Sequence, residues 1–232
     1  MLGVLVVFIF SWVILWLFSK EHITALGIIP NSQRLREFFL GLIVMALFCV
    51  INLLGQSYFK EISYVQNQDY GLSESLSGIW WTFKAALFEE LIFRGAILYL
   101  LIKKIGNNWA CIISAIAFGI YHWFSYQMLG RGIVPMIYVF LLTGAGGWMF
   151  AYAFAKTKSL FTPLGLHFGW IVISIVLFSA GPLGNSLFII EGEAVELGGW
   201  EQLLFFLLQA VIIPGIVTWY LVKKYRSSHN TE

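Results

Sequence analysis

Charged side chains are scarce in this chain. Only 11% of its 232 residues are Asp, Glu, Lys or Arg, whereas 59% are hydrophobic and 18% are aromatic. An ordinary soluble domain carries roughly 25% charged residues. The composition therefore excludes a water-soluble globule, and it also excludes a disordered, collagenous or nucleic-acid-binding chain. We expect an integral membrane protein that has the lipid bilayer as its surroundings and no nucleic acid as a partner.

Several motifs of known catalytic sites are missing as well. Asp69 is the only aspartate, which excludes a site built on two aspartates. Neither HExxH nor a GxSxG-like string occurs, so the common zinc protease and serine nucleophile patterns are absent. The two cysteines, Cys49 and Cys111, lie in apolar runs without CxxC spacing, which favours buried thiols.

Long apolar runs dominate what is present. A membrane-spanning helix needs about 20 mostly apolar residues, and we count about seven such runs. They cover residues 2–18, 38–54, 78–102, 109–124, 133–155, 160–180 and 203–222. The expected fold class is an all-α, polytopic transmembrane helix bundle. About six to eight spans are compatible with the pattern, because the glycine-rich stretch 181–200 has room for a re-entrant turn.

Lysine and arginine are distributed unevenly among the connecting segments. Ten of the 14 basic residues fall in the segments 20–37, 103–108, 156–159 and 223–232. Because basic loops stay in the cytoplasm, the pattern predicts an outside N-terminus and a cytoplasmic C-terminus, in what we expect to be a bacterial cell membrane. No internal repeat marks a second domain. We divide the chain into N-terminal membrane helices (1–77), a core that carries the motifs (78–180), and an extracytoplasmic loop with the C-terminal helix (181–232).

Ionisable side chains gather in the third apolar run. Each costs roughly 2.5–3.5 kcal/mol at the centre of a bilayer, so such residues are rare unless they are paired or functional. Glu90 and Arg94 have the i, i+4 spacing that allows a salt bridge on one helix face. Glu89 has Phe93 at that spacing and is a candidate general base. Lys84 is expected only to extend toward the interface.

Two of the four histidines lie inside apolar runs. His122 occurs in AFGIYHW and His167 in LGLHFGW, whereas His22 and His229 lie in polar segments and are expected at the surface. A buried histidine alone is more often a packed residue than a catalytic one. Two of them in a chain that also buries adjacent glutamates could hold or activate a water molecule. Carboxylate and imidazole also suit Zn²⁺, so Glu89, His122 and His167 are candidate zinc ligands.

Three short motifs carry a resemblance to a known family. EELIFRG (89–95) resembles an EExxxR motif, FGIYH (118–122) resembles FxxxH, and GLHFGW contains the histidine of an HxxxN motif. The chain is therefore similar, over about residues 78–180, to the CAAX protease and bacteriocin-processing (Abi) family of intramembrane proteases, which includes type II CAAX prenyl endopeptidases. One position departs from the pattern, because Ile171 stands where the family has Asn.

The resemblance implies a role for each matching residue. Glu89, Glu90, His122 and His167 would form the catalytic group, with Arg94 and Phe118 in support. Glu89 and His122 would activate a water molecule, and His167 would stabilise the oxyanion or complete the water site. Glu90 and Arg94 would form a structural pair. The family's Asn would assist the oxyanion, so Ile171 predicts weaker catalysis.

These observations favour a membrane endopeptidase that hydrolyses a membrane-associated peptide or protein. The alternative is a family member with little or no activity that acts as a membrane binding or bacteriocin immunity protein, and Ile171 supports that alternative. A proton- or ion-coupled transporter is less favoured, because the chain shows no repeated halves.

Overall fold

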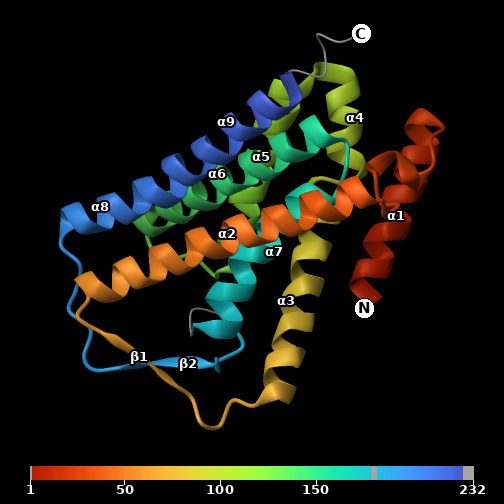
Figure 1. Ribbon diagram of the computed structural model, residues 1–232. Helices are drawn as coiled ribbons and strands as arrows, with labels where there is room; N and C mark the ends of the chain where they lie inside the picture. Colours follow the sequence, from red (N-terminus) through yellow and green to blue (C-terminus); the bar gives the residue numbers. More distant parts are fainter. Residues whose placement is uncertain (1, 179–181, 227–232) are drawn as a thin grey trace.

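The computed structural model describes residues 2–178 and 182–226, which are almost entirely helical (Figure 1). The α-helices are α1 (Leu2–Ser19), α2 (Ser32–Phe59), α3 (Leu72–Phe93), α4 (Ala96–Ile105), α5 (Asn107–Ser125), α6 (Ile133–Thr157), α7 (Phe161–Ile171), α8 (Gly199–Leu207) and α9 (Ile213–Arg226). Three shorter helical turns are η1 (Ile23–Leu26), η2 (Val172–Leu177) and η3 (Leu208–Ile212), of which η2 and η3 are π-helical. Two strands, β1 (Ser63–Gln66) and β2 (Phe188–Glu191), complete the described elements.

Four of the described helical segments are long and apolar enough to cross a membrane. They are Leu2–Ser19, Ser32–Phe59, Ile133–Thr157 and Gly199–Tyr225. A fifth apolar helix, Phe161–Leu177, is shorter. The membrane helix bundle expected from the sequence is thus supported, whereas the count of seven spans stays a prediction. Large apolar side chains are exposed along α1, α2 and α6, which is the surface that a lipid environment covers.

The run 78–102, expected as one span, is instead two helices. It is divided between α3 and α4, with Arg94 and Gly95 at the break. A Cβ atom on Gly95 would overlap the carbonyl oxygen of Leu91, so the chain can turn this tightly only because the position is glycine. Because of this break, the chain changes direction between α3 and α4, directly after the charged residues.

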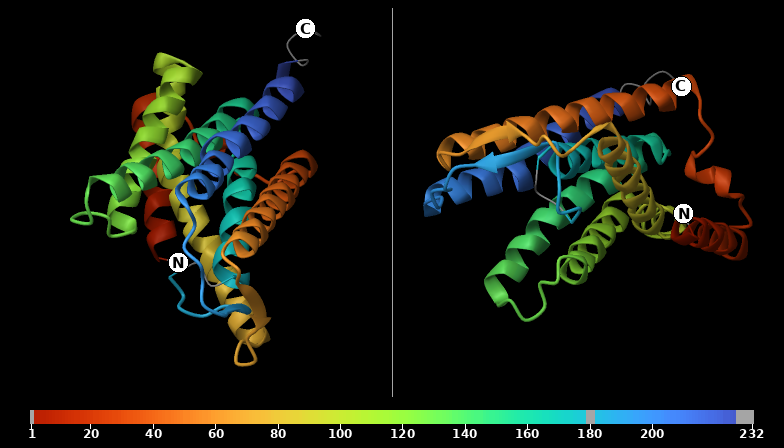
Figure 2. Two further views of the ribbon diagram at one scale, coloured as in Figure 1. Left: turned by 90° about the vertical axis from the view of Figure 1, so that its left-hand side faces the viewer. Right: turned by 90° about the horizontal axis from the view of Figure 1, so that it is seen from below.

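The connecting segments 60–71 and 182–198 meet in a small antiparallel sheet. Ser63 pairs with Glu191 and Gln66 pairs with Phe188, so strands far apart in the sequence lie side by side (Figure 2). The sequence pattern predicts only loops there, with room for a re-entrant turn in 181–200, so strands β1 and β2 were not predicted. Residues 179–181 lie outside the described part of the chain, and with them the expected end of the sixth span at 180.

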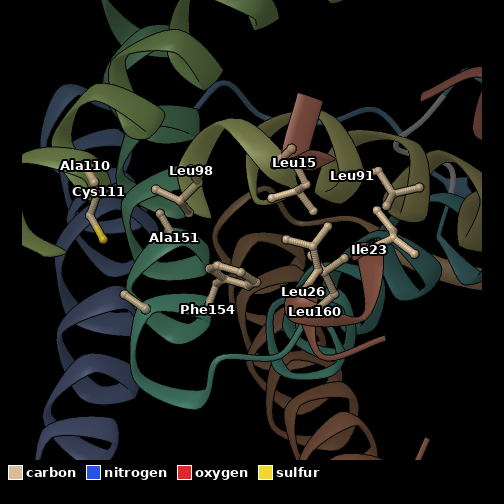
Figure 3. Packing of buried hydrophobic residues seen from close by; sticks show 12 residues of the cluster. Leu15, Ile23, Leu26, Leu91, Leu98, Ala110, Cys111, Ala151, Phe154 and Leu160 are labelled. Atoms are coloured by element: carbon tan, nitrogen blue, oxygen red, sulfur yellow. The ribbon is translucent and has the colours of Figure 1, made fainter. Parts of the chain in front are cut away.

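The main hydrophobic core joins α1, α4, α5 and α6. Leu15, Leu98, Cys111 and Phe154 are fully buried members of this core (Figure 3). Cys49 is fully buried in a second cluster near η2. Both cysteines are therefore buried thiols, as expected from the sequence. The main core contains residues of the start of α4 and the end of α3, so it fixes the position of the charged residues at the end of α3.

Helix α2 packs closely along α7. A Cβ atom on Gly165 would overlap the backbone of Phe38, and one on Gly169 would overlap the backbone of Leu42. Small residues of this kind let two membrane helices approach to backbone contact. His167 lies between the two glycines and is therefore held at a fixed height relative to α2.

The basic segments 20–37, 103–108 and 156–159 gather at one end of the bundle, together with the described end of α9. Lys103 forms an ion pair with Glu21 at 2.7 Å, and the Ser159 hydroxyl donates to the carbonyl of Gly27 at 3.1 Å. Lys224 reaches Glu37 at 3.3 Å, which brings the end of α9 to the start of α2. The sheet and the segments 60–71 and 182–198 lie at the other end (Figure 1). His229 is outside the described residues.

Candidate active site

A cavity of about 900 Å³ lies among α2, α3, α5 and α7. Glu89, His122 and His167 all line it, although they come from three different helices. A smaller cavity of about 140 Å³ adjoins it and shares both histidines. The structure therefore brings together the three residues that the sequence analysis singled out as candidates for water activation.

Glu89 faces the cavity near the end of α3. Its side chain is 15% exposed, and one carboxylate oxygen, Oε2, lies 3.8 Å from Nε2 of His167. The other oxygen, Oε1, accepts a 3.4 Å hydrogen bond from the hydroxyl of Tyr121 on α5. Glu89 thus has loose contacts on both oxygens and keeps access to the cavity, as a general base requires.

Glu90, the adjacent residue, is fully buried and has close partners. Its Oε1 lies 2.8 Å from Nδ1 of His167, and its Oε2 lies 3.2 Å from Nε of Arg94. The i, i+4 ion pair expected from the sequence is present. The contact with His167 was not predicted, because it depends on how α3 and α7 pack. Glu90 therefore orients the imidazole as well as pairing with Arg94.

Arg94 is completely buried at the end of α3. Its guanidinium carbon lies 4.3 Å from the ring centre of Phe118 and 5.0 Å from that of Phe150. Aromatic faces attract a cation, and this attraction is strongest where water is excluded. Phe118, expected to support the site, does so by lying against both Arg94 and His122.

His122 is held by its own helix. Its Nδ1–H donates to the carbonyl of Phe118 at 2.8 Å, and its ring packs against Tyr126. A ring that donates through Nδ1 leaves Nε2 as the nitrogen available to a ligand. The ring of His167, for its part, stacks on Phe150 at a centroid distance of 4.9 Å. Both imidazoles are thus fixed by packing and by one hydrogen bond each.

Position 171 lies on the wall of both cavities. Ile171 follows His167 by one helical turn and contributes an apolar side chain there. The helix then widens into the π-turn η2, and Ser174 and Ile175 of this turn also line the larger cavity. Such turns are frequent at functional sites.

Some residues of the site were not found by sequence reasoning. Tyr121 reaches Glu89 from α5, and Asn52 of α2 lines the larger cavity. Tyr121 has no distinguishing feature in an aromatic-rich sequence. Asn52 could have been noticed as an amide within an apolar run.

The zinc hypothesis was tested against the donor geometry. Among the described residues, no group of three or more His, Cys, Asp or Glu side chains is arranged to hold a metal ion. Nδ1 of each imidazole is engaged, that of His167 by Glu90 and that of His122 by the Phe118 carbonyl, which leaves Nε2 of each ring as the nitrogen that could bind a metal. The side chains as placed do not form a zinc ligand set, so the zinc site stays a prediction and no chemical step below is written through a metal.

The larger cavity also reaches the surface. Beyond Ser125 it is lined by Gln127 and Arg131, in the segment between α5 and α6, and by Gln56 and Pro182. These residues lie toward the end of the bundle that carries the sheet, away from the basic segments. A ligand of some length can therefore extend from Glu89 to that end.

Comparison with known proteins supports the resemblance seen in the motifs. Searches of curated proteins and of solved structures gave no match. A protein family model, described as type II CAAX prenyl endopeptidase Rce1-like, matches residues 72–173. The matched range contains Glu89, His122 and His167, which line the cavity, and the buried pair Glu90 and Arg94. The segment 72–173 is thus identified as similar to the Rce1-like type II CAAX prenyl endopeptidases, a family of membrane proteases, and the resemblance to these endopeptidases is confirmed.

Proposed function

We propose that this protein is an intramembrane endopeptidase that hydrolyses a peptide bond in a membrane-associated peptide or protein, with Glu89 as the general base. The observation that carries this proposal is the convergence of Glu89, His122 and His167 on one cavity among apolar helices. Burying these groups is costly, and a catalytic site is the simplest reason to bury them together.

The proposed reaction begins with a water molecule between Glu89 and the histidines. The carboxylate of Glu89 takes one proton from the water while the oxygen attacks the carbonyl carbon of the scissile bond. The C–N bond then breaks, and the proton on Glu89 passes to the departing amine. His122 orients the water through Nε2, since its Nδ1–H is bound to the Phe118 carbonyl.

His167 has a second task in this scheme. Glu90 accepts its Nδ1–H at 2.8 Å and so directs Nε2 toward Glu89 and the cavity. When this ring also carries a proton on Nε2, it can donate to the oxygen that becomes negative in the transition state. Arg94 offsets the charge of Glu90. His167 would thereby supply part of the hydrogen bonding to the negative oxygen of the transition state, which the apolar side chain of Ile171 cannot supply.

Substrate entry is proposed from the end of the bundle that bears the sheet. The cavity reaches the surface at Gln127 and Arg131, opposite the basic segments. With those segments in the cytoplasm, the entrance faces outward in a bacterial cell membrane. Peptides, leader sequences or bacteriocin-type substrates at that face would reach Glu89 directly.

The proposal is tested by turnover of a quenched peptide library with the purified protein in proteoliposomes. We expect cleavage by the parent protein and none by the Glu89→Gln protein, which retains size and hydrogen bonding but lacks the base. Equal cleavage by both proteins would trace the activity to a contaminant. Metal analysis of the same preparation tests the zinc hypothesis independently: about one zinc ion per chain would support it, and a metal-free preparation that still cleaves the peptides would exclude it.

Ile171 favours a second candidate function. A cavity with an apolar residue at this point suits a binding or immunity protein that holds a peptide without cutting it. Absence of turnover together with tight binding of peptides by the parent protein would establish this function in place of the first.

A further inference from the structure

Asn52 is a buried amide without a partner. It lies in α2, its residue surface is 2% exposed, and its Oδ1 forms no hydrogen bond to any described residue. Two other amides on the cavity wall have partners, since Gln56 accepts from Lys60 Nζ and Gln209 donates to the carbonyl of Phe205. Buried polar groups in native proteins are nearly always hydrogen-bonded. Asn52 also lines the large cavity, so a peptide in that cavity can supply the missing partner.

The packing of α2 on α7 shows how far Asn52 is from the reacting groups. Gly165 meets Phe38 and Gly169 meets Leu42, so His167 lies at the height of about residue 40. Asn52 is 12 residues further along one continuous helix, since 52 − 40 = 12. At 1.5 Å per residue this is about 18 Å. Asn52 therefore cannot touch the carbonyl that Glu89 and His167 act on.

A peptide in extended conformation covers about 3.3 Å per residue, so about 18 Å corresponds to about five residues. We propose that Asn52 binds the main chain of an extended substrate segment about five residues from the bond that is cut. This proposal rests on the peptidase function proposed above. It makes Asn52 a substrate-binding residue outside the group that performs the chemistry.

The chemistry of a carboxamide suits this role. Its Oδ1 accepts a hydrogen bond and its Nδ2 donates one, so one Asn can pair with both the N–H and the C=O of a peptide residue. Such pairing depends on the backbone and tolerates any side chain. Ser174 and Ile175 of the π-turn line the cavity as well, which leaves room for a chain between α2 and η2. The ligand class is therefore an extended peptide backbone, with little sequence selection at this point.

Peptide length provides the test. Two quenched peptides share one cleaved sequence, and the long one extends about eight residues to each side whereas the short one extends about three. The parent protein should show a lower KM for the long peptide. Asn52→Leu, which is nearly the same size, should raise the KM for the long peptide about tenfold and so abolish the preference, with kcat little changed. Asn52→Ala should act in the same direction, should the leucine variant misfold.

Thr218→Val is the matched control. Thr218 also has a buried hydroxyl oxygen without a partner among the described residues, but it does not line the large cavity. Both substitutions remove an unpaired polar atom, so both should keep or raise the thermal midpoint. Only Asn52→Leu should change the ratio of the KM values for the long and short peptides. If Asn52→Leu keeps the parent's ratio of KM values, the role of Asn52 is wrong.

Binding separates this inference from the proposed function. The affinity of the long peptide, fluorescently labelled, is measured for the Glu89→Gln protein with and without Asn52→Leu. We expect about tenfold weaker binding when Asn52 is replaced. If the parent protein cuts neither peptide, the endopeptidase function fails, and the binding comparison still decides the role of Asn52. Equal affinities would overturn it.

Discussion

At the scale of single residues, the neighbours Glu89 and Glu90 have different surroundings. Glu90 is fully buried between His167 and Arg94, with contacts of 2.8 and 3.2 Å. Glu89 has only longer contacts, of 3.4 and 3.8 Å, and it lines the cavity. We therefore expect substitution of Glu89 to lower turnover, and disruption of the Glu90–Arg94 pair to lower the stability of the fold.

Replacing Glu89 should affect the reaction and leave the fold intact. Glu89→Gln keeps the volume and can still bind Tyr121, so we expect a thermal midpoint close to that of the parent protein. Turnover should fall below detection, since an amide cannot take the proton from water. Peptide cleavage and thermal unfolding in detergent are measured on the same preparation. A large loss of stability would contradict the separate roles.

Replacing Arg94 should affect the fold. Arg94→Ala leaves Glu90 buried without its cation, which costs about 3–5 kcal/mol in comparable pairs. Lys103→Ala is the control, because Lys103 forms an exposed ion pair with Glu21. Pairs of that kind contribute at most about 1 kcal/mol. The free energies of unfolding of the two variants should differ clearly, and similar values would argue against a structural role for Arg94.

A substitution at position 171 distinguishes the two proposed functions, an endopeptidase and a protein that only binds peptides. Ile171→Asn places a hydrogen-bond donor on the cavity wall one turn after His167. In a slow endopeptidase, a well-placed donor of this kind is expected to raise kcat by about 10²–10³. In a protein that only binds peptides, the substitution leaves turnover at zero. The measurement is kcat of the parent and variant proteins on one peptide.

The sequence indicated the residues of the site but not all of their contacts. The EELIFRG, FGIYH and GLHFGW strings identified Glu89, His122 and His167, which the structure brings to one cavity. The hydrogen bond between Glu90 and His167 spans 77 positions of sequence and depends on helix packing. No local pattern encodes such a contact, and the same holds for Asn52, whose position relative to His167 follows from the packing of α2 on α7.

At the scale of helices, the position of His167 depends on the contact between α2 and α7. Gly169→Ala would place a methyl group against the backbone of Leu42, which cannot move aside as a side chain can. Overpacking of this kind costs about 1–3 kcal/mol. We expect a lower thermal midpoint and, because α7 carries His167, a loss of turnover as well.

Gly215→Ala is the control for this prediction. Gly215 lies in α9 with no heavy atom within 4 Å of an added Cβ. Alanine there should leave stability unchanged or raise it, since glycine weakens a helix by roughly 0.5–1 kcal/mol relative to alanine. If the two variants unfold at the same temperature, the close approach of α2 and α7 is not important for stability.

The helix break at Gly95 shows why sequence analysis misplaced an element. The apolar run 78–102 has the length of one span, and glycine is common in membrane helices. The turn depends on the absence of a Cβ atom beside the Leu91 carbonyl and on the core that holds α4. Both are tertiary features. The sheet formed by β1 and β2 was not predicted either. Each strand is only four residues long, and its partner lies in a distant part of the sequence.

At the scale of the whole molecule, we expect the basic segments to lie at the cytoplasmic face of the membrane. A cysteine introduced at exposed Lys104 should react with a membrane-impermeant maleimide from the cytoplasmic side, and one introduced at exposed Glu193 from the opposite side. The two native cysteines are fully buried and should not interfere. Labelling of both positions from the same side of intact cells would refute the orientation.

The entrance of the large cavity lies among Gln127, Arg131 and Pro182, far from the basic segments. For an endopeptidase of this shape, the two faces of a membrane are not equivalent. In vesicles that hold the protein in a single orientation, we expect a peptide added on the entrance side to be cleaved and the same peptide on the other side to stay intact. The orientation in which the helices insert into the membrane would then determine on which side peptides are cleaved. Membrane insertion would thereby contribute to substrate selection.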